Sequence, residues 1–288
     1  MRKGIKILVF VVVCILLLQH FNLLAKTNNT SNNLVMKYQR YVKKLSVRDI
    51  NSIKLALNES KKYMTKNKRQ NDGIFRTFYS FFENVQYNIS EDFNKGKLKL
   101  EEKDLNKYGI RIGFSESGDF LDEKPDFIYT NFANVVSAGL KRYLEILNKE
   151  MKQTRTYVIE DMGLSISWNE LADRIIAWEQ FSKDFSDYPE AKDAKSKKDF
   201  CLYIYIASYL DNTPLFLNGK LTDDTKASYE RFVTKYSNSS SFDLIQGYYQ
   251  ILKENDFVLN QKAIDYLKSN KIDTEQLENY LNREGNGE

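Results

Sequence analysis

Apolar side chains recur at helical spacing through almost the whole chain, and this periodicity limits the folds open to it. From Leu34 onward, apolar positions repeat every three or four residues, as one buried helix face requires. Only 3 prolines and 12 glycines interrupt the 288 residues, which disfavours an all-β sandwich or a loop-rich scaffold. The sequence therefore predicts a mainly α-helical protein, built as an α-solenoid-like array of helical hairpins.

One segment breaks the helical pattern. Apolar and polar residues alternate from Ile110 to Ser115, which is the period of a β-strand. The following Glu116-Ser117-Gly118-Asp119 is typical of a hairpin turn. We therefore expect one small β-hairpin near residues 109–122.

The same patterns divide the chain into regions. We expect a polar tether at 27–33, a basic helical region at 34–107, the hairpin with further helices at 108–165, and helical-hairpin repeats at 166–288. Within the basic region, Asn71-Asp72-Gly73 predicts a turn between two helices, because these residue types favour turn conformations.

Two of the predicted helices resemble each other. Trp178-Glu179-Gln180-Phe181 aligns with Tyr229-Glu230-Arg231-Phe232 at a shift of 51 residues, and another aromatic residue follows each motif. Aromatic residues at this spacing lie within about 60° of helical arc. A second helix rich in tyrosine follows each of them. The pattern predicts two helix-turn-helix units that stack on each other.

The first unit ends in Phe185-Ser186-Asp187-Tyr188-Pro189. This ending is similar to the Phe-x-x-x-Tyr-Pro ending of helix one in tetratricopeptide-like hairpins of exported bacterial proteins, from which Tyr236-Ser237-Asn238-Ser239 departs. The Trp178–Phe181 motif also resembles uncharacterised secreted proteins of Gram-positive bacteria. The resemblance covers about residues 165–255, implies a scaffold and carries over no catalytic residue. The candidate binding residues are Trp178, Phe181, Tyr203, Tyr229, Phe232 and Tyr248.

Residues 1–26 have the layout of a secretory signal. Three cationic residues precede the apolar run Ile7–Leu18, and Ala25 offers a small residue for cleavage. The run is shorter than the about 20 residues of a membrane span, but extended to Ala25 it also fits an uncleaved anchor. We therefore expect a signal peptide or an N-terminal membrane anchor, with the rest of the chain outside the cytoplasmic membrane, either anchored or secreted.

Positive charge is concentrated toward the N-terminus. Residues 1–107 contain 21 Lys and Arg against 9 Asp and Glu, whereas residues 108–288 contain 22 against 30. A basic region beside a membrane is attracted to anionic lipid or to an anionic wall polymer. Residues 34–107 therefore either contact one of these or form a solvated helix surface, and we expect no nucleic-acid partner for an exported chain.

Motifs for catalysis are scarce. The single histidine, His20, lies in the apolar leader, which excludes Ser-His-Asp catalysis and histidine-bound zinc in the rest of the chain. No phosphate-binding loop, nucleophile elbow or calcium loop is present. The sequence thus predicts no cofactor and no metal site. Cys201 lies in an apolar stretch, where a buried and inert thiol is expected.

Carboxylates leave one enzymatic hypothesis open. Glu116, in the hairpin turn, sits where many lysozyme-like folds present their acid, which protonates a glycosidic oxygen while a second carboxylate stabilises charge or activates water. Candidates for the second carboxylate are Glu160, Asp161, Asp122 and Asp126. The alternative function is thus a cell-wall glycan hydrolase. The sequence favours instead an exported, membrane-proximal helical protein that binds a protein or peptide at the cell surface.

Overall fold

The computed structural model describes residues 31–286 except 116–117 and 155–157. The helices are α2 (Ser31–Val42), α3 (Asn51–Tyr63), α4 (Lys68–Asn94), α5 (Glu102–Leu105), α6 (Phe127–Phe132), α7 (Ala138–Gln153), α8 (Trp168–Asp184), α9 (Glu190–Ala207), α10 (Asp223–Lys235), α11 (Phe242–Glu254), α12 (Gln261–Ser269) and α13 (Glu275–Asn286), with a 3₁₀ turn η2 (Asn106–Tyr108). Strands pair as antiparallel hairpins: β1 (Ile110–Ser115) with β2 (Gly118–Glu123), β3 (Ile159–Glu160) with β4 (Gly163–Leu164), and β5 (Phe216–Leu217) with β6 (Lys220–Leu221).

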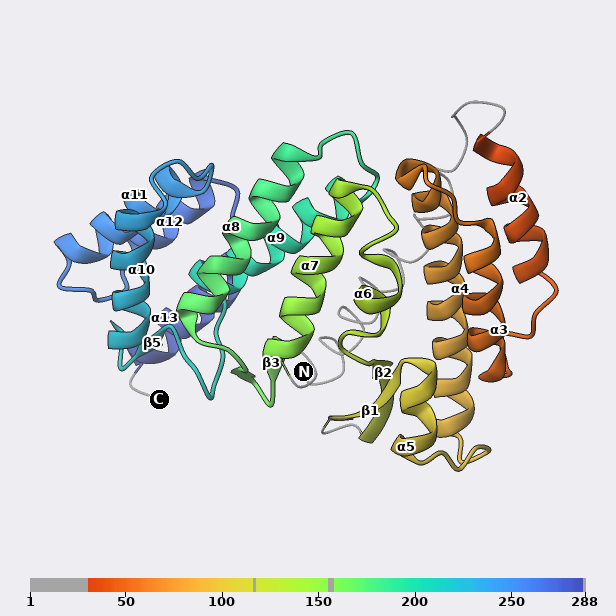
Figure 1. Cartoon of the computed structure of the whole chain (residues 1–288). Coiled ribbons are helices and arrows are strands. Elements are labelled where there is room, and N and C mark those ends of the chain that lie inside the picture. The colour runs from red at the N-terminus through yellow and green to blue at the C-terminus, as the bar shows by residue number, and fades with distance from the viewer. Residues whose placement is uncertain (1–30, 116–117, 155–157, 287–288) are drawn as a thin grey trace.

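The helices stand side by side in a row, with α2 at one end and α11 and α12 at the other (Figure 1). This arrangement confirms the prediction of a mainly α-helical array. Within the described residues, no helix combines the length and the apolar character needed to cross a bilayer. The expected leader at 1–26 lies outside the described residues, and so does most of the expected tether at 27–33.

The N-terminal end is a three-helix cluster in which α2 and α3 both pack on α4. The turn predicted at Asn71-Asp72-Gly73 is wrong, because α4 runs through these residues without a break. Asn71 Nδ2 donates to the Val135 carbonyl at 2.7 Å, and Asp72 accepts from the Ser137 N–H and hydroxyl at 2.9 and 2.5 Å. Asn71 also exchanges two hydrogen bonds with the Thr65 backbone, both at 2.9 Å. These partners satisfy the buried polar side chains, which would otherwise favour local turn hydrogen bonds.

The long hairpin forms at the predicted place and packs on α4. Ile110 pairs with Glu123 at its open end, and the buried side chains of Ile110 and Leu121 face the core. Gln86 Nε2 of α4 donates to the Leu121 carbonyl at 2.9 Å. The hairpin therefore holds Glu123 against the side of α4.

The two similar units of the sequence are α8–α9 and α10–α11. Helices α8 and α10 end in the same way: the Phe185 N–H donates to the Phe181 carbonyl at 3.0 Å, and the Tyr236 N–H donates to the Phe232 carbonyl at 2.9 Å. In both helices the final aromatic ring lies 5.3 Å from the aromatic ring one turn earlier. The aligned residues thus occupy equivalent places.

Two short hairpins, β3–β4 and β5–β6, precede α8 and α10 in addition to the single hairpin that was expected. Two residues with left-handed φ connect each pair of strands: Asp161 (50°) and Met162 (53°), then Asn218 (52°) and Gly219 (75°). Left-handed φ at both central positions characterises type I′ turns. Each unit is thus a hairpin followed by two helices, and the hairpins lie along one edge of the array (Figure 1).

Two clusters of buried apolar residues meet inside α8 and α9. One cluster contains Trp168 from the start of α8 and Ala207 from the end of α9, together with residues of α10–α13. The other contains Trp178 from the second half of α8 and Ala194 from the first half of α9, together with residues of α2–α7. Because each helix contributes to both clusters, the α8–α9 pair joins the two halves of the molecule.

Candidate functional site

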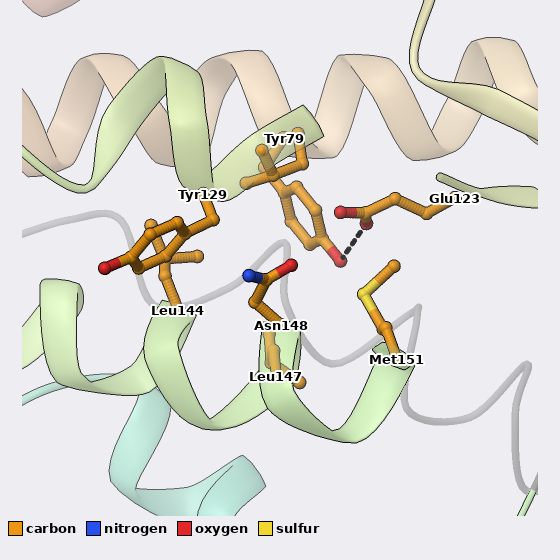
Figure 2. Close-up of a pocket in the computed structure, with 8 residues that line it drawn as sticks. Tyr79, Glu123, Tyr129, Leu144, Leu147, Asn148 and Met151 are labelled. Atoms are coloured by element: carbon orange, nitrogen blue, oxygen red, sulfur yellow. Dashed lines mark hydrogen bonds between the residues drawn. The ribbon is translucent and has the colours of Figure 1, made fainter. Parts of the chain in front are cut away.

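A small polar cavity lies between α4, β2, α6 and α7 (Figure 2). Its volume is about 10 Å³, which is room for a single water molecule. Tyr79 of α4 and Glu123 of β2 point toward each other, and the Tyr79 hydroxyl donates to Glu123 Oε2 at 3.2 Å. The other lining residues are Ile128, Tyr129, Leu144, Leu147, Asn148 and Met151.

Two carboxyl groups in this region titrate far above the usual range of glutamate. Burial raises the pKa of Glu123 to about 8, against the opposing effect of the hydrogen bond from Tyr79. Burial also raises the pKa of Glu83 on α4 to about 7; the charge of Asp193 on α9 adds to this rise and Lys197 opposes it. Both carboxyl groups therefore bind protons readily near neutral pH.

Polar contacts next to these carboxyl groups tie three helices together. The Tyr143 hydroxyl of α7 donates to Asp193 Oδ2 of α9 at 2.6 Å. The Arg76 guanidinium of α4 donates to both carboxylate oxygens of Glu190, at the start of α9, at 2.7 and 3.0 Å. The arrangement can hold protons and order one water molecule, and it has no space for a larger substrate.

A wider depression lies along α7 next to the cavity. It has a volume of about 410 Å³, is open to solvent, and is lined by Tyr129, Glu145, Asn148, Lys149, Lys152 and Gln153. Asn148 exchanges two hydrogen bonds with Asp126, at 2.7 and 2.8 Å, and Lys152 Nζ lies 2.6 Å from Asp126 Oδ1. Because these groups satisfy one another, the depression offers few free polar groups to a ligand.

Of the carboxylates proposed for glycan hydrolysis, the four that the structure describes do not line this cavity. Glu116 lies outside the described residues. Asp122 forms an ion pair with Arg111 of β1 at 2.7 Å, and Asp126 forms the ion pair with Lys152 described above. Glu160 and Asp161 belong to the β3–β4 hairpin. The hydrolase therefore stays a prediction that no contact among the described residues supports. No group of three or more His, Cys, Asp or Glu in this part of the chain could hold a metal ion.

The structure places the aromatic binding candidates in the core. Five of the six are less than 2% exposed, namely Trp178, Phe181, Tyr229, Phe232 and Tyr248. Tyr203 is partly buried. The rings contact other residues of the array; for example, the centroids of Tyr205 and Tyr229 lie 5.0 Å apart. The aromatic stripes thus join helices to one another. Cys201 is also buried, and burial raises the pKa of its thiol to about 12.

Some of the exposed apolar side chains lie on or beside the short hairpins. Leu217 pairs with Lys220 across β5–β6, and Lys220 in turn pairs with Val258 in the loop after α11. Directly paired residues project from the same face of a sheet. Leu217, Lys220 and Val258 therefore form one exposed surface, which we call the hairpin patch. The turn residue Met162 is exposed on the neighbouring β3–β4 hairpin.

No protein-family model matches this sequence, and neither a curated protein nor a solved structure is significantly similar to it.

Proposed function

We propose that this protein is an exported helical scaffold that is held close to the membrane and binds a protein partner through the hairpin patch. Export and anchoring are supported by the N-terminal sequence, in which cationic residues precede the apolar run Ile7–Leu18. A scaffold role is supported by the array of paired helices, which presents long continuous surfaces.

The hairpin patch carries this proposal because the two faces of its small sheet differ in burial. On the inner face, Phe216 and Leu221 are 1% and 4% exposed. On the outer face, Leu217 is 62% and Val258 is 40% exposed. Scattered apolar residues are normal on surfaces, whereas neighbouring ones with a polar rim are typical of interfaces.

Hydrogen bonds from the rest of the chain hold this surface in place. The Leu221 N–H donates to the Phe257 carbonyl and the Leu259 N–H donates to the Gly219 carbonyl, both at 2.8 Å. The Gly219 N–H donates to the Tyr280 hydroxyl at 2.7 Å. A surface fixed in this way loses little conformational freedom when a partner binds, which favours affinity.

Site-specific photo-crosslinking of the full-length protein in its own cells tests the proposal. A photoreactive amino acid at position 217 or 258 should give a discrete adduct with one envelope protein. The matched controls are positions 200 and 87, because Phe200 and Tyr87 are 52% and 51% exposed but lie on α9 and α4. Adducts of equal yield at the control positions, or none at 217 and 258, would contradict binding through the hairpin patch.

A further inference from the structure

The outward face of α2 and of the turn after it is positively charged. Its exposed cations are Lys37, Arg40, Lys43 and Lys44. At 100° per residue, Lys37 and Arg40 lie together with Met36 within about 100° of helical arc, and Lys43 and Lys44 follow in the turn. Tyr38 and Val42, on the other side of the helix, are 0% and 6% exposed. The helix thus buries one face and presents a compact basic face to solvent.

Helix α3 extends this face. Its exposed side carries Lys54, Leu55, Lys61 and Lys62. Ile53 and Ala56, on its other side, are fully buried. Since α2 and α3 both pack on α4, their exposed sides turn away from α4, at the end of the array (Figure 1). We call the exposed sides of α2 and α3 together the basic face.

The protein leaves the charge of the basic face largely unneutralised. Within the described part of the chain, Lys62 alone among these cations has an ion-pair partner, Glu59 at 2.7 Å. Asp49 and Glu59 are the only acidic residues between positions 33 and 66. By contrast, Arg76, a partly buried cation of α4, is neutralised by Glu190, whose carboxylate lies 2.7 Å from the guanidinium. Unneutralised cations on one face favour an anionic partner.

We propose that the basic face docks on the anionic headgroups of the membrane in which the N-terminal segment is anchored. Met36 and Leu55, which are 44% and 48% exposed, enter the headgroup region. Basic side chains beside apolar ones are the features by which surface helices bind anionic bilayers. This proposal rests on the membrane anchoring proposed above.

The length of chain before α2 selects lipid over wall polymer. Only six residue steps separate Ala25, the last residue of the apolar stretch, from Ser31, the first residue of α2. An extended chain spans at most about 3.6 Å per residue, so this link reaches no further than about 22 Å. With the apolar stretch in the bilayer, α2 is therefore confined to a layer next to the headgroups.

Hydrogen exchange of the full-length protein in lipid nanodiscs tests the docking. We compare discs of neutral phosphatidylcholine with discs that also contain phosphatidylglycerol. Amides of residues 33–63 should exchange several-fold more slowly in the anionic discs, and the difference should vanish at 1 M salt, where the Debye length is about 3 Å. Amides of α10 and α11 serve as the internal reference and should not change.

Two triple charge-reversal variants test which residues bind the anionic headgroups. The triple variant Lys37→Glu, Arg40→Glu, Lys44→Glu should lose the slowed exchange. The control Lys183→Glu, Lys195→Glu, Lys253→Glu changes the net charge equally at exposed lysines on α8, α9 and α11 and should keep it. Circular dichroism confirms that both variants are folded.

Three results would overturn the lipid assignment. The first is equal exchange of residues 33–63 in the two kinds of disc. The second is an unchanged response of the first triple variant. The third is slowed exchange with soluble poly(glycerol phosphate) but not with anionic discs, which would assign the face to wall polymer. The crosslinking at position 217 is independent of all three, so a failure there is distinguishable from a failure here.

Discussion

At the residue scale, the carboxyl groups of Glu83 and Glu123 set the pH dependence of stability. Their pKa values of about 7 and about 8 exceed the about 4.3 of an unfolded glutamate. The folded chain therefore binds more protons than the unfolded chain between these values, and the free energy of unfolding falls as the pH rises through this interval. We expect a loss on the order of 5 kcal/mol between pH 5.5 and pH 8.5, measured by urea unfolding.

The variant Glu123→Gln should make this profile shallower and leave only the part due to Glu83, because an amide accepts the Tyr79 hydrogen bond without titrating. Glu254→Gln is the control, since the pKa of Glu254 is lowered by Lys262 and its titration lies below this pH range. A profile that is equally steep in Glu123→Gln and in the wild-type protein would exclude this group as the cause.

At the element scale, the start of α8 depends on one side chain. Ser167 Oγ accepts from the Glu170 N–H at 3.2 Å, and the Glu170 carboxylate accepts from the Ser167 N–H at 3.0 Å, which completes a capping box. Ser167→Ala should lower the free energy of unfolding by about 1 kcal/mol. An unchanged free energy of unfolding of Ser167→Ala in chemical denaturation would contradict this role of the cap.

The elements that could be predicted from the sequence are those whose pattern is local. The helical spacing of apolar residues and the alternation at Ile110–Ser115 both reflect neighbours within one helix or strand. The turn at Asn71-Asp72-Gly73 was wrong because residues far away in the chain satisfy the Asp72 carboxylate and part of the Asn71 amide. The short hairpins were missed because two-residue strands show no alternation, although Asn218-Gly219 is a recognised hairpin signal.

The candidate site was harder to predict from the sequence than the fold. The spacing of Trp178 and Phe181 is the same whether a stripe faces a neighbouring helix or a groove, and only the packing of the array shows that it is buried. Likewise, the high pKa of Glu123 arises from the elements that surround it, which no motif encodes.

At the scale of the whole molecule, the two clusters of buried residues should unfold together, because α8 and α9 belong to both. The protein has two tryptophans, and they report on different clusters: Trp168 on that of α10–α13 and Trp178 on that of α2–α7. We expect Trp168→Phe and Trp178→Phe to unfold in urea with one transition each, at which fluorescence and circular dichroism coincide. A fluorescence midpoint that is displaced from the circular dichroism midpoint would show that the clusters unfold separately.

The shared α8–α9 pair also has a mechanical consequence. The proposed membrane contact lies at the α2 end of the molecule, and the hairpin patch lies beyond α9, near the other end. Tension between an anchored N-terminus and a partner at the patch would pass through the α8–α9 pair. Because Trp168 and Trp178 lie in the same helix but in different clusters of buried residues, pulling the two ends of the molecule apart would load the packed core of the α8–α9 pair.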